Sequence, residues 1–174
     1  MAQRVLGIPI TLLSASVGQV FFQSAVQEKV QTGQARVIFK STVKKLLIIT
    51  IPFFVVLYFI IEDLFAFVFS DDWRIAGTYS KLLIPVFAIR LVSSPVSMIN
   101  TVFEKQIYGL IISIVLLVSY ISVVFSSLYL GWDPEQTLSV LSAVLFTEYC
   151  IFLLHYYLLS GGDYISMFFS KASK

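Results

Sequence analysis

The sequence predicts an all-α membrane protein with about five transmembrane helices. Of its 174 residues, 58% are hydrophobic and only 13% are charged, whereas a soluble domain carries about 25% charged residues. A core within a chain of this length cannot bury so much apolar surface, so lipid is expected to cover the excess. The apolar residues also gather in long runs, and these do not alternate as barrel strands do. Because backbone groups in lipid must bond within their own segment, we expect helices.

Five segments have a length near the ~20 residues that a helix needs to cross the hydrocarbon core. They are 5–23, 46–61, 82–103, 107–130 and 137–159, and an aromatic extension at 64–69 follows the second. Pro134 is expected to start the last helix, with Asp133 as its cap. A signal peptide is the rival interpretation of the first segment, but no small-residue cleavage site followed by a polar domain is present. We therefore expect a single helical membrane domain over residues 1–174.

The loops predict the orientation of the chain. The stretch 24–45 has one acid, Glu28, and a group of bases, namely Lys29, Arg36, Lys40, Lys44 and Lys45. The stretches 70–81 and 131–135 have no such excess, and positively charged loops stay in the cytoplasm. We expect the first loop and the C-terminus to face the cytoplasm and the N-terminus to face outward. Because five crossings then begin from an outward-facing N-terminus, we expect the chain to be a fragment that lacks at least one preceding segment.

The first loop has two interpretations. Hydrophobic residues are scattered among its bases, as in a helix that lies on the cytoplasmic membrane surface. A plain topological loop would show the same basic residues. Both interpretations remain open at the level of the sequence.

The third segment is the one around which the others are expected to pack. It carries Arg90 near its middle, between Pro85 and Pro95, and the small residues Ser93 and Ser94. An arginine at membrane depth costs about 3 kcal/mol even on insertion scales, so such a residue usually has a partner, a wet cavity or a function. The prolines are expected to bend or loosen their helices and expose backbone groups.

Two further ionisable residues lie in the last segment. Glu148 is expected at a depth similar to that of Arg90, and His155 lies two turns further along the same helix face. In one interpretation Arg90 and Glu148 form a buried ion pair that only fixes helix packing. In the other, Arg90 lines a cavity and binds substrate, and Glu148 and His155 take part in ion or proton coupling. His155 also fits a plain position near the interface, beside Tyr156 and Tyr157.

Several strings resemble the C-terminal half of the Wzx-like polysaccharide-biosynthesis flippases of the MOP exporter superfamily. They are RVLGIPITLLSASVGQV followed by FFQSA, LFAFVFSDDWRIAGTYSKLLIP, SSPVSMI and FEKQ, which together cover nearly the whole chain. At Ser70 the family usually has a glycine. The resemblance implies the second six-helix bundle of a MOP/MATE-like transporter, of which this chain would supply about the last five helices.

The resemblance also implies a function. The family moves undecaprenyl pyrophosphate-linked oligosaccharide repeat units across the bacterial inner membrane by alternating access between two bundles. The expected partners are therefore the lipid-linked oligosaccharide, the bilayer, and a missing N-terminal bundle or other membrane subunits. A pyrophosphate is anionic, so Arg90 becomes a candidate contact for it.

Other function classes find little support in the sequence. The net charge of +2 is too small to indicate nucleic acid as a partner. One histidine and one cysteine cannot build a metal cluster or a disulfide, and no nucleotide-binding loop or GxSxG motif is present. We expect no enzyme activity, cofactor or metal. Two alternatives to the flippase remain: a multidrug or ion-coupled exporter of the same superfamily, and a membrane scaffold that transports nothing.

Overall fold

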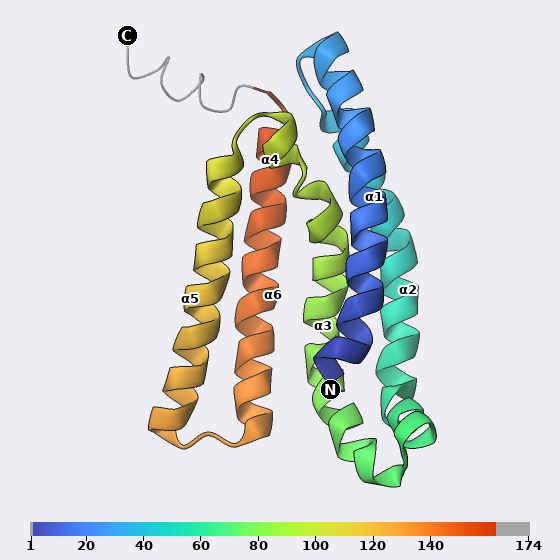
Figure 1. Ribbon diagram of the computed structural model, residues 1–174, viewed down its shortest axis with the longest axis vertical. Coiled ribbons are helices and arrows are strands. Elements are labelled where there is room, and N and C mark those ends of the chain that lie inside the picture. The colour runs from blue at the N-terminus through green and yellow to red at the C-terminus, as the bar shows by residue number, and fades with distance from the viewer. Residues whose placement is uncertain (1, 163–174) are drawn as a thin grey trace.

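The computed structural model in Figure 1 describes residues 2–162, with side chains from Thr11 onward. The described part of the chain is all-helical and has no strand. In chain order the elements are α1 (Ala2–Thr32), α2 (Arg36–Phe69), the 3-10 turn η1 (Asp71–Trp73), α3 (Arg74–Val96), α4 (Ile99–Val102), α5 (Gln106–Leu130) and α6 (Pro134–Leu159).

Four stretches of the described residues are long and apolar enough to cross a membrane. They are Arg36–Phe69, Asp71–Val102, Gln106–Leu130 and Pro134–Leu159. The protein is therefore an all-α, multi-pass membrane protein, as predicted. The predicted segment 5–23 lies within α1, and because its first side chains lie outside the described ones, its crossing stays a prediction.

The predicted loop between the first two segments is mostly helical. Helix α1 continues to Thr32 and α2 begins at Arg36, so the stretch is not a separate surface helix, and only residues 33–35 connect the two helices. Gly33, at φ +74°, ends α1 in the left-handed conformation that glycine accepts without strain. The carboxylate of Glu28 accepts the backbone N–H groups of Val37 at 3.0 Å and Ile38 at 2.8 Å, and so caps α2. The basic residues consequently lie along two helix ends.

Helix α3 is the centre of the bundle, as the sequence predicted for this segment. It packs against α1, α2 and α6, while α5 packs against α6 on the side away from α2 (Figure 1). One apolar cluster joins α2 to α3 around Phe54, Ile61 and Phe87. A second cluster joins α1, α2, α4 and α6 around Phe21 and Ile99. Burial of these side chains on α3 fixes the relative positions of the helices that line the site below.

The two ends of the bundle differ in charge. The α1–α2 turn, α4 and the end of α6 lie together at the top of Figure 1, and we call this the basic end after Lys29, Arg36, Lys40 and Lys44. The η1 turn and the α5–α6 turn lie at the opposite, acidic end, which carries Glu62, Asp63, Asp71 and Asp133. The loops therefore alternate between two ends as the loop charges predicted.

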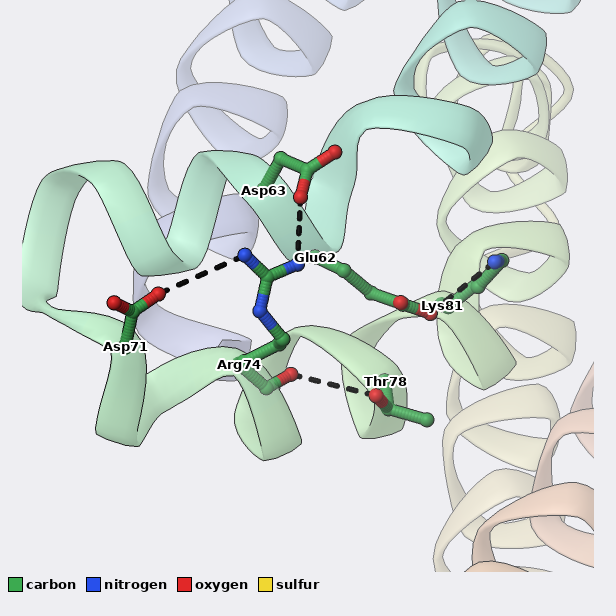
Figure 2. A network of polar contacts seen from close by, with 6 residues as sticks. All are labelled: Glu62, Asp63, Asp71, Arg74, Thr78 and Lys81. Carbon is green, nitrogen blue, oxygen red and sulfur yellow. Dashed lines mark hydrogen bonds and ion pairs between the residues drawn. The ribbon is translucent and has the colours of Figure 1, made fainter.

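At the acidic end, ion pairs join α2 to α3. Arg74 donates to Asp63 at 2.6 Å and lies 3.6 Å from Asp71, as Figure 2 shows. Lys81 donates to Glu62 at 3.1 Å. These contacts explain why α3 begins at Arg74, eight residues before the predicted segment, since its polar first turns are satisfied by the end of α2.

The last helix begins as predicted from its capping residues. Pro134 occupies the first turn of α6, and Asp133 and Gln136 form a reciprocal capping box. Helix α5 ends at Gly131, which is left-handed at φ +65°. The resulting short turn holds α5 and α6 as an antiparallel pair (Figure 1).

Candidate functional site

A polar cavity of about 350 Å³ lies among α3, α4, α5 and α6. It falls near the lower end of the 300–1,000 Å³ typical of small-ligand sites. Its polar lining side chains are Arg90, Ser93, Ser94, Ser97, Asn100, Thr101, Gln106, Ser113, Tyr149 and Tyr156. Polar side chains in an otherwise apolar membrane protein are expensive unless they face one another or a wet space. Their convergence makes this cavity the candidate site.

The cavity lies beside an interruption in a membrane-spanning stretch. Pro95 cannot donate a backbone hydrogen bond, and α3 ends one residue later, at Val96. The Ser97 backbone N–H is shared between the carbonyls of Ser93 and Ser94, and the chain resumes as the short helix α4. Helix α3 thus ends just after Pro95, whereas it continues through Pro85 and α2 continues through Pro52. Ser97 and Met98 keep right-handed helical dihedrals, so the interruption is a tightened turn between two helices of one membrane-spanning stretch.

Helix α1 closes the other side of this interruption. Gly18 lies against Pro95, and a β-carbon at Gly18 would be 3.6 Å from the α-carbon and from the carbonyl oxygen of Pro95. At the basic end the Lys29 ammonium donates to the carbonyl oxygen of Val102 at 2.7 Å and lies 5.1 Å from the centre of the Phe103 ring. Helix α1 therefore supports both ends of the 97–103 stretch.

Arg90 lines the polar cavity and is exposed. Within residues 11–162 its guanidinium has no hydrogen-bond or ion-pair partner at contact distance. The cavity-lining position is one of the two expected from the sequence. The ion pair with Glu148, the other expectation, does not form in this structure.

Glu148 instead faces α5. Its Oε1 accepts a short hydrogen bond from the hydroxyl of Ser119, while Oε2 is buried and has no hydrogen-bond partner among the described residues. Tyr149, the next residue, lines the cavity together with Arg90. Neighbouring positions on a helix point about 100° apart, which is why Glu148 reaches α5 and Tyr149 reaches the cavity.

His155 lies on the same interface between α5 and α6. Its ring is 5.2 Å from that of Tyr108 on α5 and 5.8 Å from that of Tyr156, measured between centroids. The Nε2 atom is buried and has no hydrogen-bond partner in the described part of the chain. Glu148 and His155 therefore share the α5-facing side of α6, as their spacing predicted, and each keeps one polar atom unsatisfied.

Asn100 is a site residue that the sequence analysis missed. It is 4% exposed, lines the cavity, and its Oδ1 has no hydrogen-bond partner within residues 11–162. An asparagine inside an apolar segment was a usable signal. Positions 90, 93, 97 and 100 recur at three- and four-residue spacing, so one face of the α3–α4 stretch lines the cavity.

Metal binding finds no support in this part of the chain. Residues 11–162 contain no group of three or more His, Cys, Asp or Glu side chains that would hold a metal ion. The polar cavity offers one guanidinium together with hydroxyl and amide groups, a set that suits an anionic or highly hydroxylated ligand.

Fold and site together define a multi-pass helical membrane protein with a polar cavity at an interrupted helix. Comparison with protein-family models, with curated proteins and with solved structures found no match to this chain.

Proposed function

We propose that this chain belongs to a flippase that moves a lipid-linked oligosaccharide, carried on undecaprenyl pyrophosphate, across the bacterial inner membrane. The observation that carries the proposal is the position of Arg90, exposed in a polar cavity at an interrupted helix and without a protein partner within residues 11–162. A guanidinium presents several N–H donors in a plane and binds phosphate oxygens in pairs. At membrane depth, such an unpaired cation favours an anionic ligand.

The interrupted helix also supports a transport function. Secondary transporters often bind substrate near the membrane midplane, beside discontinuous helices. Here the break between α3 and α4 borders the cavity that contains Arg90 and Asn100. Hydroxyl and amide groups on its wall suit the sugar part of the proposed substrate.

The backbone at Ser70 adds support to the family resemblance. This position, where the Wzx-like proteins usually have glycine, has φ +111° and ψ 164°. That region of backbone conformation is occupied almost only by glycine. Ser70 therefore differs from the family in its residue type, while its backbone has a conformation that a glycine would adopt without strain.

In this proposal the basic end faces the cytoplasm, because positively charged loops stay on that side. Glu148 and His155 serve coupling, since each keeps one buried polar atom without a partner in the described chain. Alternating access requires groups whose protonation or ion binding differs between two states, and unsatisfied buried polar groups are suited to that task.

The test compares Arg90 variants in the bacterium from which the chain derives and in vesicles. The full-length gene product with Arg90→Gln is expected to transport lipid-linked oligosaccharide at least tenfold more slowly, and Arg90→Lys is expected to retain part of the rate. The matched control is Lys45→Gln, which removes one positive charge from an exposed position outside the cavity. Transport is measured as surface polysaccharide and as the lipid-linked repeat unit left on the cytoplasmic leaflet.

The outcomes separate the proposed function from its rivals. An Arg90→Gln protein that is present at wild-type abundance and transports at the wild-type rate would overturn the proposal. Loss of surface polysaccharide in the Arg90→Gln strain, combined with no translocation by the wild-type protein in reconstituted vesicles, would indicate a scaffold. Export of cationic drugs without translocation of the lipid-linked sugar would indicate the multidrug exporter.

A further inference from the structure

A second, apolar depression is lined by α2, α3 and α6. It is an open groove of about 830 Å³ between α2 and α6, with Ile89 of α3 at its floor. Its α2 wall runs from Lys40 to Pro52, and its α6 wall includes Cys150, Leu154 and Tyr157. Apart from the two lysines at one end, Lys40 and Lys44, the lining is almost entirely hydrophobic.

The lysines at this end have no acidic partner. Lys40 and Lys44 are exposed, and neither forms an ion pair within residues 11–162. The acid nearest to them in sequence, Glu28, uses both carboxylate oxygens to cap α2. Their positive charges are therefore left uncompensated at the mouth of an apolar groove.

Tyr157 contacts two of the cations at this end of the groove. Its ring lies 5.5 Å from the Lys40 ammonium and 5.1 Å from the guanidinium carbon of Arg36, measured to the ring centroid. Arg36 packs over Gly161, where a β-carbon would be 2.2 Å from Nη2, so this cation is used in joining α2 to the end of α6. Lys40 and Lys44 are one helical turn apart and are the two cations that line the groove.

The length of the groove matches one leaflet. The twelve-residue step from Lys40 to Pro52 corresponds to roughly 18 Å along a helix, a little more than half of the ~30 Å hydrocarbon core. The groove therefore runs from the membrane surface at the basic end to about the midplane. The acyl chain of a lipid whose headgroup lies at the basic end of the bundle would extend over a similar distance.

We propose that this groove is a binding site for an anionic phospholipid, with its phosphate on Lys40 and Lys44 and one acyl chain along the α2–α6 wall. The two lysines lie at one end of the groove and its hydrophobic wall follows, which matches a phospholipid with its charged headgroup followed by an acyl chain. Clusters of Lys or Arg at the membrane surface attract anionic lipid, and they do so without a fitted pocket. The groove adds a fixed place for the chain, and the site does not depend on the proposed transport function.

The test measures which lipid stays bound. The full chain is purified with mixed phosphatidylglycerol and phosphatidylcholine, and retained lipid is counted by native mass spectrometry. The proposal expects phosphatidylglycerol to be retained in preference, and the double variant Lys40→Gln/Lys44→Gln to reduce its retention roughly tenfold. Lys45→Gln, which removes an equally exposed charge outside the groove, is the control and is expected to retain phosphatidylglycerol.

A second pair of variants locates the acyl chain. Leu154→Trp fills the groove and is expected to reduce retention, whereas Leu128→Trp, at an exposed position on α5, is expected to leave it unchanged. Lys40→Arg/Lys44→Arg keeps both charges and is expected to restore retention, which controls for folding. Equal retention of the two lipids, equal loss in the Lys45 control, or a helical protein found in the groove in place of lipid would each overturn the proposal.

Discussion

Glu148 on α6 accepts a hydrogen bond from the hydroxyl of Ser119 on α5. This contact gives the carboxylate a partner other than Arg90, which lines the polar cavity among α3, α4, α5 and α6. The two ionisable residues therefore serve different interfaces. One holds the α5–α6 pair together, and the other is left for the cavity.

A double-mutant cycle on Ser119→Ala and Glu148→Leu is expected to show a coupling of about 1–2 kcal/mol, because hydrogen bonds between membrane helices reach this range. The measurement is unfolding of the purified chain in increasing SDS. The comparison cycle, Arg90→Gln with Glu148→Gln, is expected to show less coupling, since no ion pair joins them. Stronger coupling in the second cycle than in the first would contradict the assignment.

A charge swap tests the same point by another route. In a purely structural ion pair, Arg90→Glu combined with Glu148→Arg would recover the function that each single variant loses. The geometry predicts no recovery, because the arginine at 148 would face Ser119 and the glutamate at 90 would face the cavity. Recovery of wild-type transport or stability would show that the two residues do pair.

Gly77→Ala is expected to destabilise the chain by about 1–3 kcal/mol, as overpacking of a tight contact does. A β-carbon at Gly77 would lie 2.7 Å from the α-carbon of Glu62, so α3 would have to move away from α2. Gly109→Ala is the matched control, because the nearest atom there is 3.8 Å away. If SDS unfolding finds both variants equally stable, the result would contradict the close contact between α2 and α3 at Gly77.

Ser70→Gly is expected to stabilise the chain by about 1 kcal/mol, since it relieves a backbone conformation that only glycine adopts without strain. Ser126→Gly in α5 is expected to act in the opposite sense, because glycine within a helix costs about 0.5–1 kcal/mol relative to alanine. The two variants are compared in one unfolding series. A loss of stability at position 70 would contradict the φ of +111°.

Glu28→Ala is expected to cost about 1 kcal/mol, because it removes the cap from the backbone N–H groups of Val37 and Ile38. Glu104→Ala serves as the control: its side chain is 87% exposed and only 4.0 Å from Lys29, so little stability depends on it. If the two substitutions lower the free energy of unfolding equally, the Glu28 cap does not stabilise the short α1–α2 turn.

Much of the fold was accessible from the sequence because hydrophobic runs have a length that lipid dictates. The segments 107–130 and 137–159 correspond to α5 and α6 within three residues at each end. The predictions were less successful where polar residues continue a helix beyond the membrane. The stretches around Lys29 and Arg74 looked like loops, but Glu28, Glu62 and Asp63 satisfy their polar groups.

The candidate site was predictable only in part. Arg90 was identified because a charge is costly in an apolar segment, and Glu148 for the same reason. The spacing along two separate helices could not decide whether they face each other. Asn100 was missed because only charged side chains were considered within the apolar segments, although it shares the cavity-lining face with Arg90.

The sequence by itself determined the membrane class, the order of the apolar segments and the sorting of charge to two ends, because each of these follows from the transfer of single residues between water and lipid. Only the tertiary structure decided which polar groups meet. Arg90 lines the polar cavity while Glu148 bonds to Ser119 of α5, and the α2–α6 groove exists because α3 holds those two helices apart. Helix rotation and packing set these relations, and they depend on contacts between residues that are distant in the chain.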